Sequence, residues 1–141
     1  MGVGQAIDNF GGAEIFGTEV HSEVEFVERI EEGLPVRAVD TLLELGDLTE
    51  ADFDQVIPRR TLSHARKRGR LSADQSDRIV RAARVYARAH EVFGDREKAN
   101  RWMRRPNRAL EGKAPIELLR TSNGSDLVVA VLDRIAYGVY T

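Results

Sequence analysis

A dense group of cations lies between residues 59 and 70, and its side chains could bind phosphate groups. The segment RRTLSHARKRGR contains no acidic residue, and short polar side chains lie among its arginines. Arginine and lysine neutralise DNA phosphates, while forked or short polar side chains contact base edges in the major groove. We therefore predict a DNA-binding segment whose contacts come from Arg59, Arg60, Thr61, Ser63, His64, Arg66, Lys67, Arg68 and Arg70.

The chain offers little that could carry out catalysis. It contains no cysteine, which excludes a disulfide framework, a thiolate nucleophile and a thiolate metal ligand. The three histidines, His21, His64 and His90, show no metal-ligand spacing. The sequence also has no glycine loop of the kind that holds a phosphate. We predict no catalytic residue, no metal, no cofactor and no enzyme activity.

The C-terminal stretch DRIAYGVYT is the second unusual feature. Two of the three tyrosines lie there, and tyrosine gives a large contact area with few rotatable bonds. Such a stretch either folds back on its own core or binds another protein. A helix should stop at Gly138, so Tyr140 and Thr141 are the better interface candidates, while Tyr137 could belong to either surface.

The net charge of −2 conceals a strong asymmetry along the chain. Residues 1–58 carry a balance of −12, residues 59–108 a balance of +11, and the remaining residues −1. A basic middle segment favours a polyanion as its partner. The alternative is a solvated basic helix that pairs with the acidic N-terminal third, and charge alone leaves both open.

Helical periodicity dominates the chain and strand signals are scarce, so we predict an all-α fold. Capping residues and glycine or proline stops place helices at 23–32, 36–45, 50–57, 59–68, 73–93, 96–105 and 116–119, with a last helix within 121–138. The apolar side chains expected on the buried faces of the first and last helices are Val24, Val27 and Ile30, and Leu127, Val128, Val131, Leu132 and Ile135.

The basic segment follows a short acidic helix and a break at Ile57-Pro58, which is the layout of a helix-turn-helix. Leu62 and Ala65 can face the core and hold the basic helix in place. The turn departs from the usual form, in which a glycine occupies it. We place a mobile arm at residues 1–20 and the DNA-binding domain at 21–85.

The remainder, residues 86–141, is predicted to be a second, small helical domain. Trp102 should pack against Phe93 and Leu110, because an indole of that size dominates a small core. Proline, asparagine and glycine then shape the connection to the next helix. The residues to which we assign structural roles are Trp102, Pro106, Asn107, Gly112 and Pro115.

Ordered pieces of this second half resemble a known family. They are SDR and a following arginine at 76–81, VFGD at 92–95, A.RWM..PN.AL.GK.P.ELL at 99–119, and RIAYGVYT at 134–141. Together they resemble the toxin-binding domain of Xre/MbcA/ParS-type antitoxins, the partners of RES-domain toxins. The resemblance extends over nearly all of the chain from residue 59 onward.

The resemblance implies a two-part antitoxin of a type II toxin–antitoxin pair. An Xre-like helix-turn-helix would bind the operator of its own operon, and the C-terminal domain would dimerise and bind the toxin. RES toxins of this family degrade NAD, and the C-terminal segment of the antitoxin blocks the active-site entrance. By that likeness the blocking segment, with its terminal carboxylate, comprises Tyr137, Gly138, Val139, Tyr140 and Thr141.

The expected partners are therefore a RES-domain toxin, operator DNA and a second copy of the chain. No apolar run approaches the length of a membrane span and the first residues do not resemble a signal peptide, so we expect a cytoplasmic protein with no membrane partner. The alternative function is a dimeric helix-turn-helix transcriptional regulator with no toxin partner.

Overall fold

The computed structural model describes residues 20–138, and within them it is helical with no β-strand, which confirms the all-α prediction. No helix in this part of the chain combines the length and apolar character needed to cross a membrane. The elements are α3 (Glu23–Glu32), α4 (Ala38–Gly46), α5 (Glu50–Phe53), α6 (Arg59–Arg68), α7 (Ala73–Phe93), α8 (Arg96–Arg104), the 3-10 helices η1 (Arg108–Leu110) and η2 (Pro115–Leu118), and α9 (Ser122–Ala136).

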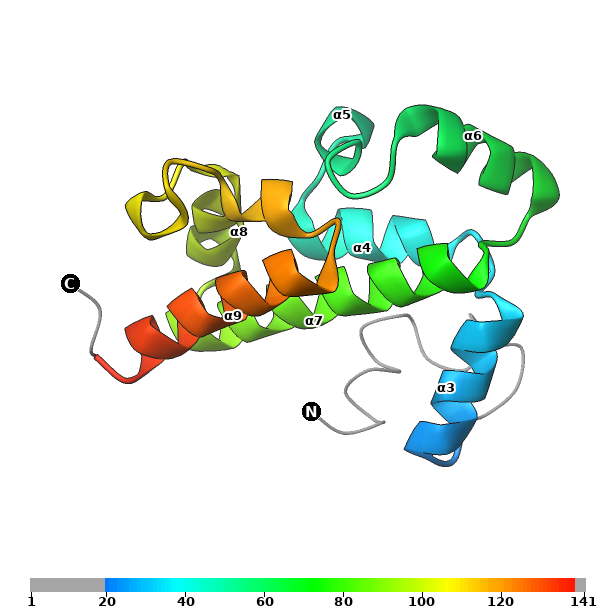
Figure 1. Cartoon of the computed structure of the whole chain (residues 1–141), viewed down its shortest axis with the longest axis horizontal. Helices are drawn as coiled ribbons and strands as arrows, with labels where there is room; N and C mark the ends of the chain where they lie inside the picture. Colours follow the sequence, from blue (N-terminus) through cyan, green and yellow to red (C-terminus); the bar gives the residue numbers. More distant parts are fainter. Residues whose placement is uncertain (1–19, 139–141) are drawn as a thin grey trace.

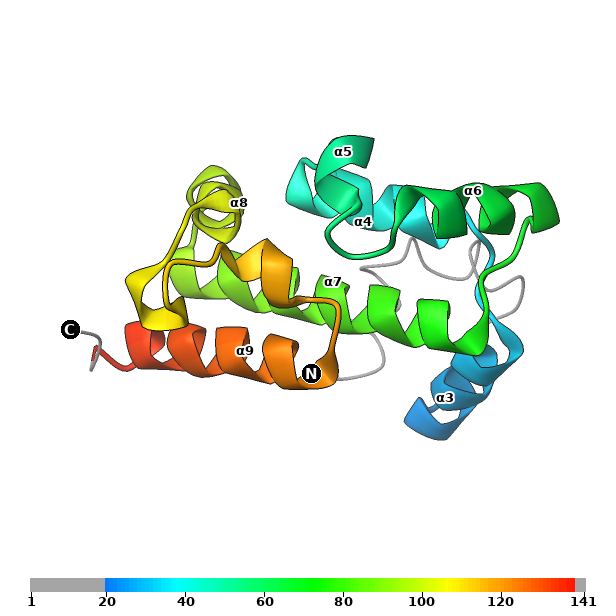
Figure 2. The same ribbon diagram turned by 45° about the horizontal axis from the view of Figure 1, so that its top comes forward.

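The long helix α7 is the spine of the molecule, and α3, α4, α8 and α9 all pack on it (Figure 1). Viewed with the top turned forward, α4, α5 and α6 lie over its first half, whereas α9 runs beside it in the same direction toward the other end (Figure 2). Because α7 continues unbroken through residue 85, the two predicted domains share this helix and a continuous apolar core.

Local capping explains where most helices begin. Ser72 accepts a hydrogen bond from the Gln75 amide, and the Gln75 side chain accepts one from the Ser72 amide, at 3.1 and 2.8 Å. Thr49 and Asp52 form the same reciprocal pair at the start of α5. Each pair satisfies two of the amides that the first turn of a helix leaves unpaired. Both helix starts are as predicted from the sequence.

Helix α5 is shorter than predicted and ends at Phe53. Residues 54–57 form turns instead, with Val56 and Ile57 buried in the core. The Asp54 carboxylate accepts a hydrogen bond from the Arg59 amide at 2.8 Å, which stabilises the turn into α6. The break at Ile57-Pro58 is thus a buried connection between the two helices rather than a glycine turn.

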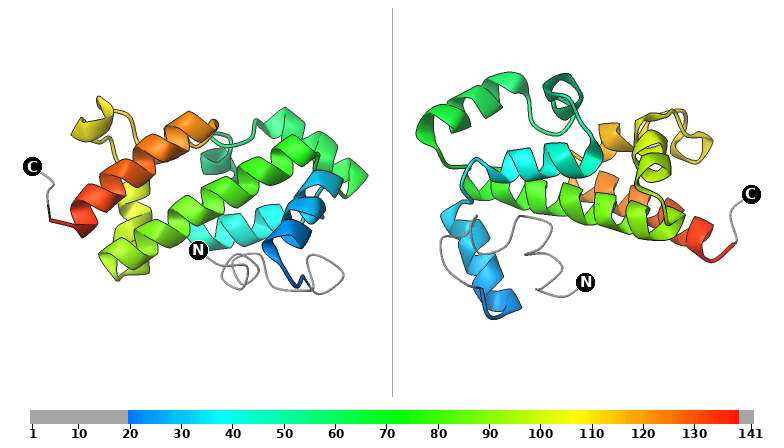
Figure 3. Two further views of the ribbon diagram at one scale, coloured as in Figure 1. Left: turned by 60° about the horizontal axis from the view of Figure 1, so that its bottom comes forward. Right: turned by 180° about the vertical axis from the view of Figure 1, so that it is seen from behind.

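The prediction of the buried face of α3 is wrong for Val24 and Val27 and correct for Ile30, which packs against the core. Val24 and Val27 are 69% and 51% exposed, and Phe26 is the side chain that is buried. Phe26 and Ile30 lie one turn apart and point toward α7, where the Arg84 guanidinium lies 6.0 Å from the Phe26 ring centroid. Seen from below and from behind, α3 extends from one end of α7, and among residues 20–138 no other helix covers its far side (Figure 3).

The prediction for α9 is correct in part. Val128, Val131 and Leu132 are buried and Ile135 is partly buried, but Leu127 is 57% exposed. Successive helical residues are about 100° apart, so Leu127 lies at the edge of the buried arc and turns outward. The helix contacts α7, η1 and η2 along one side, and its other side has no covering element among residues 20–138.

Gly46 closes α4 where the backbone passes close to an aromatic ring of α7. A Cβ at Gly46 would lie 2.9 Å from Cε1 of Tyr86, closer than side chains pack. The left-handed residue that ends the helix is then Asp47, with φ of 51°, and not the glycine that the sequence indicated as a stop.

Tyr86 provides a test of this packing, because its side chain is fully buried and its hydroxyl has no hydrogen-bond partner among the described residues. Burial raises the pKa of this hydroxyl, so it stays neutral. An unpaired buried polar group costs free energy, so we expect Tyr86→Phe to leave the free energy of unfolding unchanged or raise it by about 1 kcal/mol. Tyr86→Ala should lower it by about 3–5 kcal/mol. Urea unfolding measures both, and a loss in Tyr86→Phe would contradict this packing.

Candidate functional site

Helix α6 lies on the outer side of the molecule, above α4 and α7 (Figure 1). Leu62 and Ala65 are buried and anchor it to the core, as predicted. A helix anchored along one side presents its opposite side to solvent. The residues exposed on that side are called here the outward face of α6 and comprise Arg60, Ser63, His64, Lys67 and Arg68.

The outward face of α6 holds cations with no protein partner. Within residues 20–138, Arg60, Lys67 and Arg68 take part in no ion pair or side-chain hydrogen bond. Arg60 and Arg68 line one shallow hollow with Thr61 and His64, and Lys67 lines another with Ser63. Exposed cations interleaved with hydroxyls and an imidazole are suited to phosphates and base edges.

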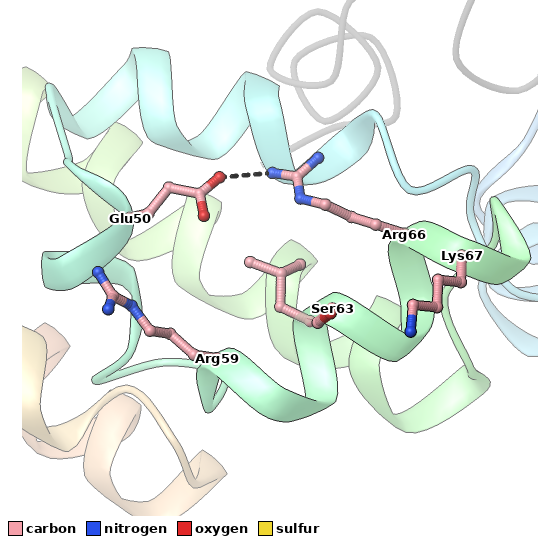
Figure 4. A pocket seen from close by; sticks show the side chains of 6 residues that line it. Glu50, Arg59, Ser63, Arg66 and Lys67 are labelled. Carbon is pink, nitrogen blue, oxygen red and sulfur yellow. Dashed lines mark hydrogen bonds and ion pairs between the residues drawn. The ribbon is translucent and has the colours of Figure 1, made fainter.

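Arg66 points the other way. Its Nη2 lies 3.0 Å from a Glu50 carboxylate oxygen and 3.4 Å from one of Asp40, so it joins α6 to α5 and α4. Figure 4 shows it directed at Glu50 across a hollow that Arg59, Ser63 and Lys67 also line. Arg70 is likewise engaged, because its Nη1 donates to the Gly33 carbonyl at 2.6 Å. Both cations therefore bind groups in the N-terminal part of the chain, as in the alternative in which the basic helix pairs with that part.

A second group of side chains in the basic middle segment, two arginines and an asparagine, also binds the N-terminal part. Arg96, Asn100 and Arg104 lie on one side of α8, and we call them the α8 clasp. Asn100 donates to the Leu45 carbonyl at 3.1 Å and to the Asp47 carboxylate at 2.9 Å. Arg96 donates to the Glu44 carbonyl and to Asp47, and Arg104 donates to the carbonyls of Gly46 and Asp47.

The α8 clasp satisfies the C-terminal end of α4. The last carbonyls of a helix have no partner within it and carry partial negative charge, which guanidinium and amide donors neutralise. All four carbonyls of residues 44–47 obtain a donor from α8. Arg120 acts similarly on the carbonyls of residues 54 and 55, at 3.1 and 3.0 Å. These contacts fix how the helices before α7 lie against those after it.

Sequence reasoning missed the α8 clasp because its acceptors are backbone atoms some 50 positions away. The available signal was the spacing of Arg96, Asn100 and Arg104 at i, i+4 and i+8, which puts them on one side of a helix. His90 supports the arrangement, since its Nε2 lies 2.8 Å from the Asn100 side-chain oxygen.

Removing the Asn100 amide should weaken the fold in a pH-dependent way. In Asn100→Ala the partly buried Leu45 carbonyl loses its donor, so the free energy of unfolding should fall by about 1–3 kcal/mol at neutral pH. The Asn100 hydrogen bond, with the charges of Arg96 and Arg104, holds the pKa of Asp47 below its ordinary 3.8. A depressed pKa adds stability above that value and loses it as the pH falls through the folded pKa, so the variant should be less acid-sensitive.

Urea unfolding at neutral pH and below pH 3.8 measures both effects. Arg101→Ala is the matched control, because Arg101 is an exposed α8 residue outside the clasp and should change stability by less than about 0.5 kcal/mol. Equal stability of Asn100→Ala and the wild type would contradict a positioning role for the clasp.

The C-terminal end of α9 lies at the opposite end of the molecule from α6 (Figures 1 and 2). The helix ends at Ala136, and the Gly138 amide donates to the Ile135 carbonyl at 3.2 Å in a left-handed conformation with φ of 70°. Tyr137 is 77% exposed, so it does not belong to the core of its own helix. Val139, Tyr140 and Thr141 lie outside the described residues.

The residues with assigned structural roles shape the segment between α8 and α9. The Trp102 ring packs on Phe93 with centroids 5.6 Å apart, as predicted. Pro106 follows α8, and Asn107 caps η1 by accepting a hydrogen bond from the Ala109 amide at 2.9 Å. Gly112 donates to the Asn107 carbonyl at 2.9 Å, and Pro115 opens η2. In the part of the chain that the structure describes, no group of three acidic or histidine side chains is placed to hold a metal ion.

Two family models match the chain in succession. Residues 25–84 match the model described as the antitoxin Xre-like helix-turn-helix domain, and residues 88–138 match the antitoxin Xre/MbcA/ParS C-terminal toxin-binding domain. The two matches adjoin within α7. The first therefore contains α6, and the second contains the α8 clasp and α9.

Curated relatives and a solved structure agree with these matches. Antitoxin Xre of Pseudomonas putida is 38% identical over 121 residues, covering 85% of this chain and 76% of the relative. The mycobacterial cidal antitoxin MbcA of Mycobacterium tuberculosis is 31% identical over 108 residues, covering 71% and 82%. A chain in the crystal structure of the M. tuberculosis MbcT–MbcA toxin–antitoxin complex aligns with a TM-score of 0.56 and 28% identity, over 75% of this chain and 96% of that one.

Proposed function

The chain belongs to the Xre/MbcA/ParS family of antitoxins, and from that membership we propose that it neutralises a RES-domain toxin that degrades NAD and represses its own operon. As an antitoxin it is one half of a toxin–antitoxin system, so the alternative of a regulator with no toxin partner is set aside. The observation that carries the proposal is the succession of a helix-turn-helix match and a toxin-binding match along one chain.

The toxin contact is proposed at the C-terminal end of α9. Tyr137, Gly138, Val139, Tyr140 and Thr141 enter the active-site entrance of the toxin and exclude NAD from it. The exposed Tyr137 ring supports this assignment, because a large aromatic side chain that residues 20–138 leave exposed is a typical interface anchor. The similarity to a chain from a solved toxin–antitoxin complex supports a protein partner.

The DNA contact is proposed on the outward face of α6, with Arg59 and Thr61 beside it. Four cations of the segment, Arg59, Arg60, Lys67 and Arg68, are available for phosphates, since Arg66 and Arg70 have partners within the protein. Each neutralised phosphate contributes about −0.9 to the log–log salt slope, so one chain should give a slope of roughly −3.6. A homodimer in the cytoplasm would place two such helices on half-sites about 34 Å apart.

Co-expression in a bacterial host tests the proposed pair. The gene adjacent to this one should stop growth and deplete cellular NAD when expressed alone, and co-expression of this chain should restore both. The product of an operon reporter should fall when this chain is present. Growth arrest with unchanged NAD would overturn the RES assignment, and an unaffected reporter would overturn repression.

A further inference from the structure

One side of α9 is exposed and its residues are of mixed apolar and charged character. Leu127, Ala130, Arg134 and Tyr137 stand at i, i+3, i+7 and i+10, so they line up along one side of the helix, and we call them the α9 face. Leu127 is 57% and Tyr137 77% exposed, while the opposite side is buried against the core. Singly exposed apolar residues are ordinary, but a row of them beside a contact site is informative.

The maximum extended length of residues 139–141 limits how far from Gly138 a partner bound by them can lie. A three-residue stretch that starts at Gly138 spans at most about 10 Å. The following argument rests on the proposed function, in which these residues enter the active-site entrance of the toxin. The rim of that entrance must then lie within about 10 Å of Gly138, next to the last turns of α9.

An interface of ordinary size would extend well along α9 from there. A standard interface covers about 800 Å² on each partner, which corresponds to a disc of roughly 16 Å radius. Leu127 lies ten residues before Tyr137, or about 15 Å along a helix. The toxin surface around the entrance therefore reaches Leu127 if it follows the uncovered side of α9, and the other sides are occupied by α7, η1 and η2.

The α9 face also has the composition of a contact surface. Leu127 and Tyr137 supply two apolar anchors, and Ala130 between them lets a partner approach the helix backbone closely. Arg134 on the face and Asp126 at its edge form no ion pair among residues 20–138, so they can pair with a partner at the rim. Apolar anchors surrounded by charged groups are the usual anatomy of a protein interface.

We propose that the α9 face is a second toxin-contacting surface, continuous with the C-terminal segment, and that it supplies affinity while the segment blocks the active site. Tyr137 belongs to both surfaces, whereas Leu127 and Ala130 belong to the α9 face alone. A polar or acidic substitution at Leu127 or Ala130 therefore weakens complex formation, and deletion of the C-terminal segment removes inhibition together with the affinity that Tyr137 supplies.

The test measures binding of full-length variants to the purified product of the adjacent gene by isothermal titration calorimetry. Leu127→Asp and Ala130→Glu alter exposed positions of the helix, so both should fold, as circular dichroism would verify. We expect each to raise the Kd about 30-fold or more, the loss that defines an interface hot spot. The matched control Ala73→Asp adds the same charge at an exposed position where α7 begins and should bind within about twofold of the wild type.

The outcomes separate this inference from the proposed function. Wild-type affinity in both variants, together with lost inhibition after deletion of residues 137–141, would overturn the α9 face and leave the proposed function standing. Weaker binding in both variants, with an unchanged size in the free state, supports the α9 face. If the variants instead turn a free dimer into a monomer at wild-type toxin affinity, the face joins two copies of this chain and the inference is wrong.

Discussion

Deletion of residues 137–141 should yield a folded antitoxin that no longer inhibits its toxin. The deletion removes no buried side chain among the described residues, because α9 ends at Ala136 and Tyr137 is exposed. The free energy of unfolding should therefore change by less than about 0.5 kcal/mol. If the segment occupies the active-site entrance, its loss readmits NAD. We expect NAD consumption by the toxin at near its uninhibited rate in the presence of equimolar truncated protein.

Full-length protein with Tyr137→Phe is the matched control for this deletion. It keeps the aromatic area at the interface and should inhibit within about threefold of the wild type, because a solvent-exposed hydroxyl contributes little. Inhibition by the truncated protein equal to that of the full chain would contradict the assignment of the blocking segment.

Reversing two charges on the outward face of α6 should abolish operator binding. Arg60→Glu with Lys67→Glu removes two proposed phosphate contacts and introduces repulsion, so affinity for operator DNA should fall by more than about 100-fold at physiological salt. Neither side chain has a partner in the described protein, so the fold should remain intact. Toxin inhibition should be unchanged because the C-terminal end of α9 lies at the other end of the molecule. Fluorescence anisotropy with labelled operator measures the loss.

The control for that double variant is Arg101→Glu with Arg105→Glu. It makes the same change of charge at one exposed position in α8 and at the exposed residue that follows the helix, both outside the α8 clasp, and should keep operator affinity within about tenfold. Arg66→Glu is unsuitable for this purpose, since it would place a carboxylate beside Asp40 and Glu50 and weaken the fold. A larger loss from the α8 pair than from the α6 pair would move the DNA contact to α8.

Local features of the sequence predicted the helices and their starts well. The hydroxyls of Ser72 and Thr49 accept hydrogen bonds from amides three residues away, so a short stretch of sequence is enough to predict these helix starts. The inward turn of Leu62 and Ala65 follows equally from the spacing within one helix. The outward face of α6 was predictable for the same reason.

Long-range contacts were not predictable in this way. A helix with apolar residues on several sides does not reveal which side meets the core, and on α3 the larger Phe26 is buried in place of Val24 and Val27. The partners of Arg66 and of the α8 clasp come from distant segments, so a count of charges could not separate the cations proposed to bind DNA from the cations that hold α4. Only the fold divides the cations of residues 59–108 into these two groups.

The most direct test of the central claim is the dependence of toxin inhibition on NAD concentration. If the C-terminal segment of this antitoxin occupies the NAD-binding entrance of the toxin, the two compete, and the apparent inhibition constant of the full-length protein should rise in proportion to NAD above its KM. An inhibition constant that does not change with NAD concentration would contradict the claim, because the antitoxin would then act away from the active site.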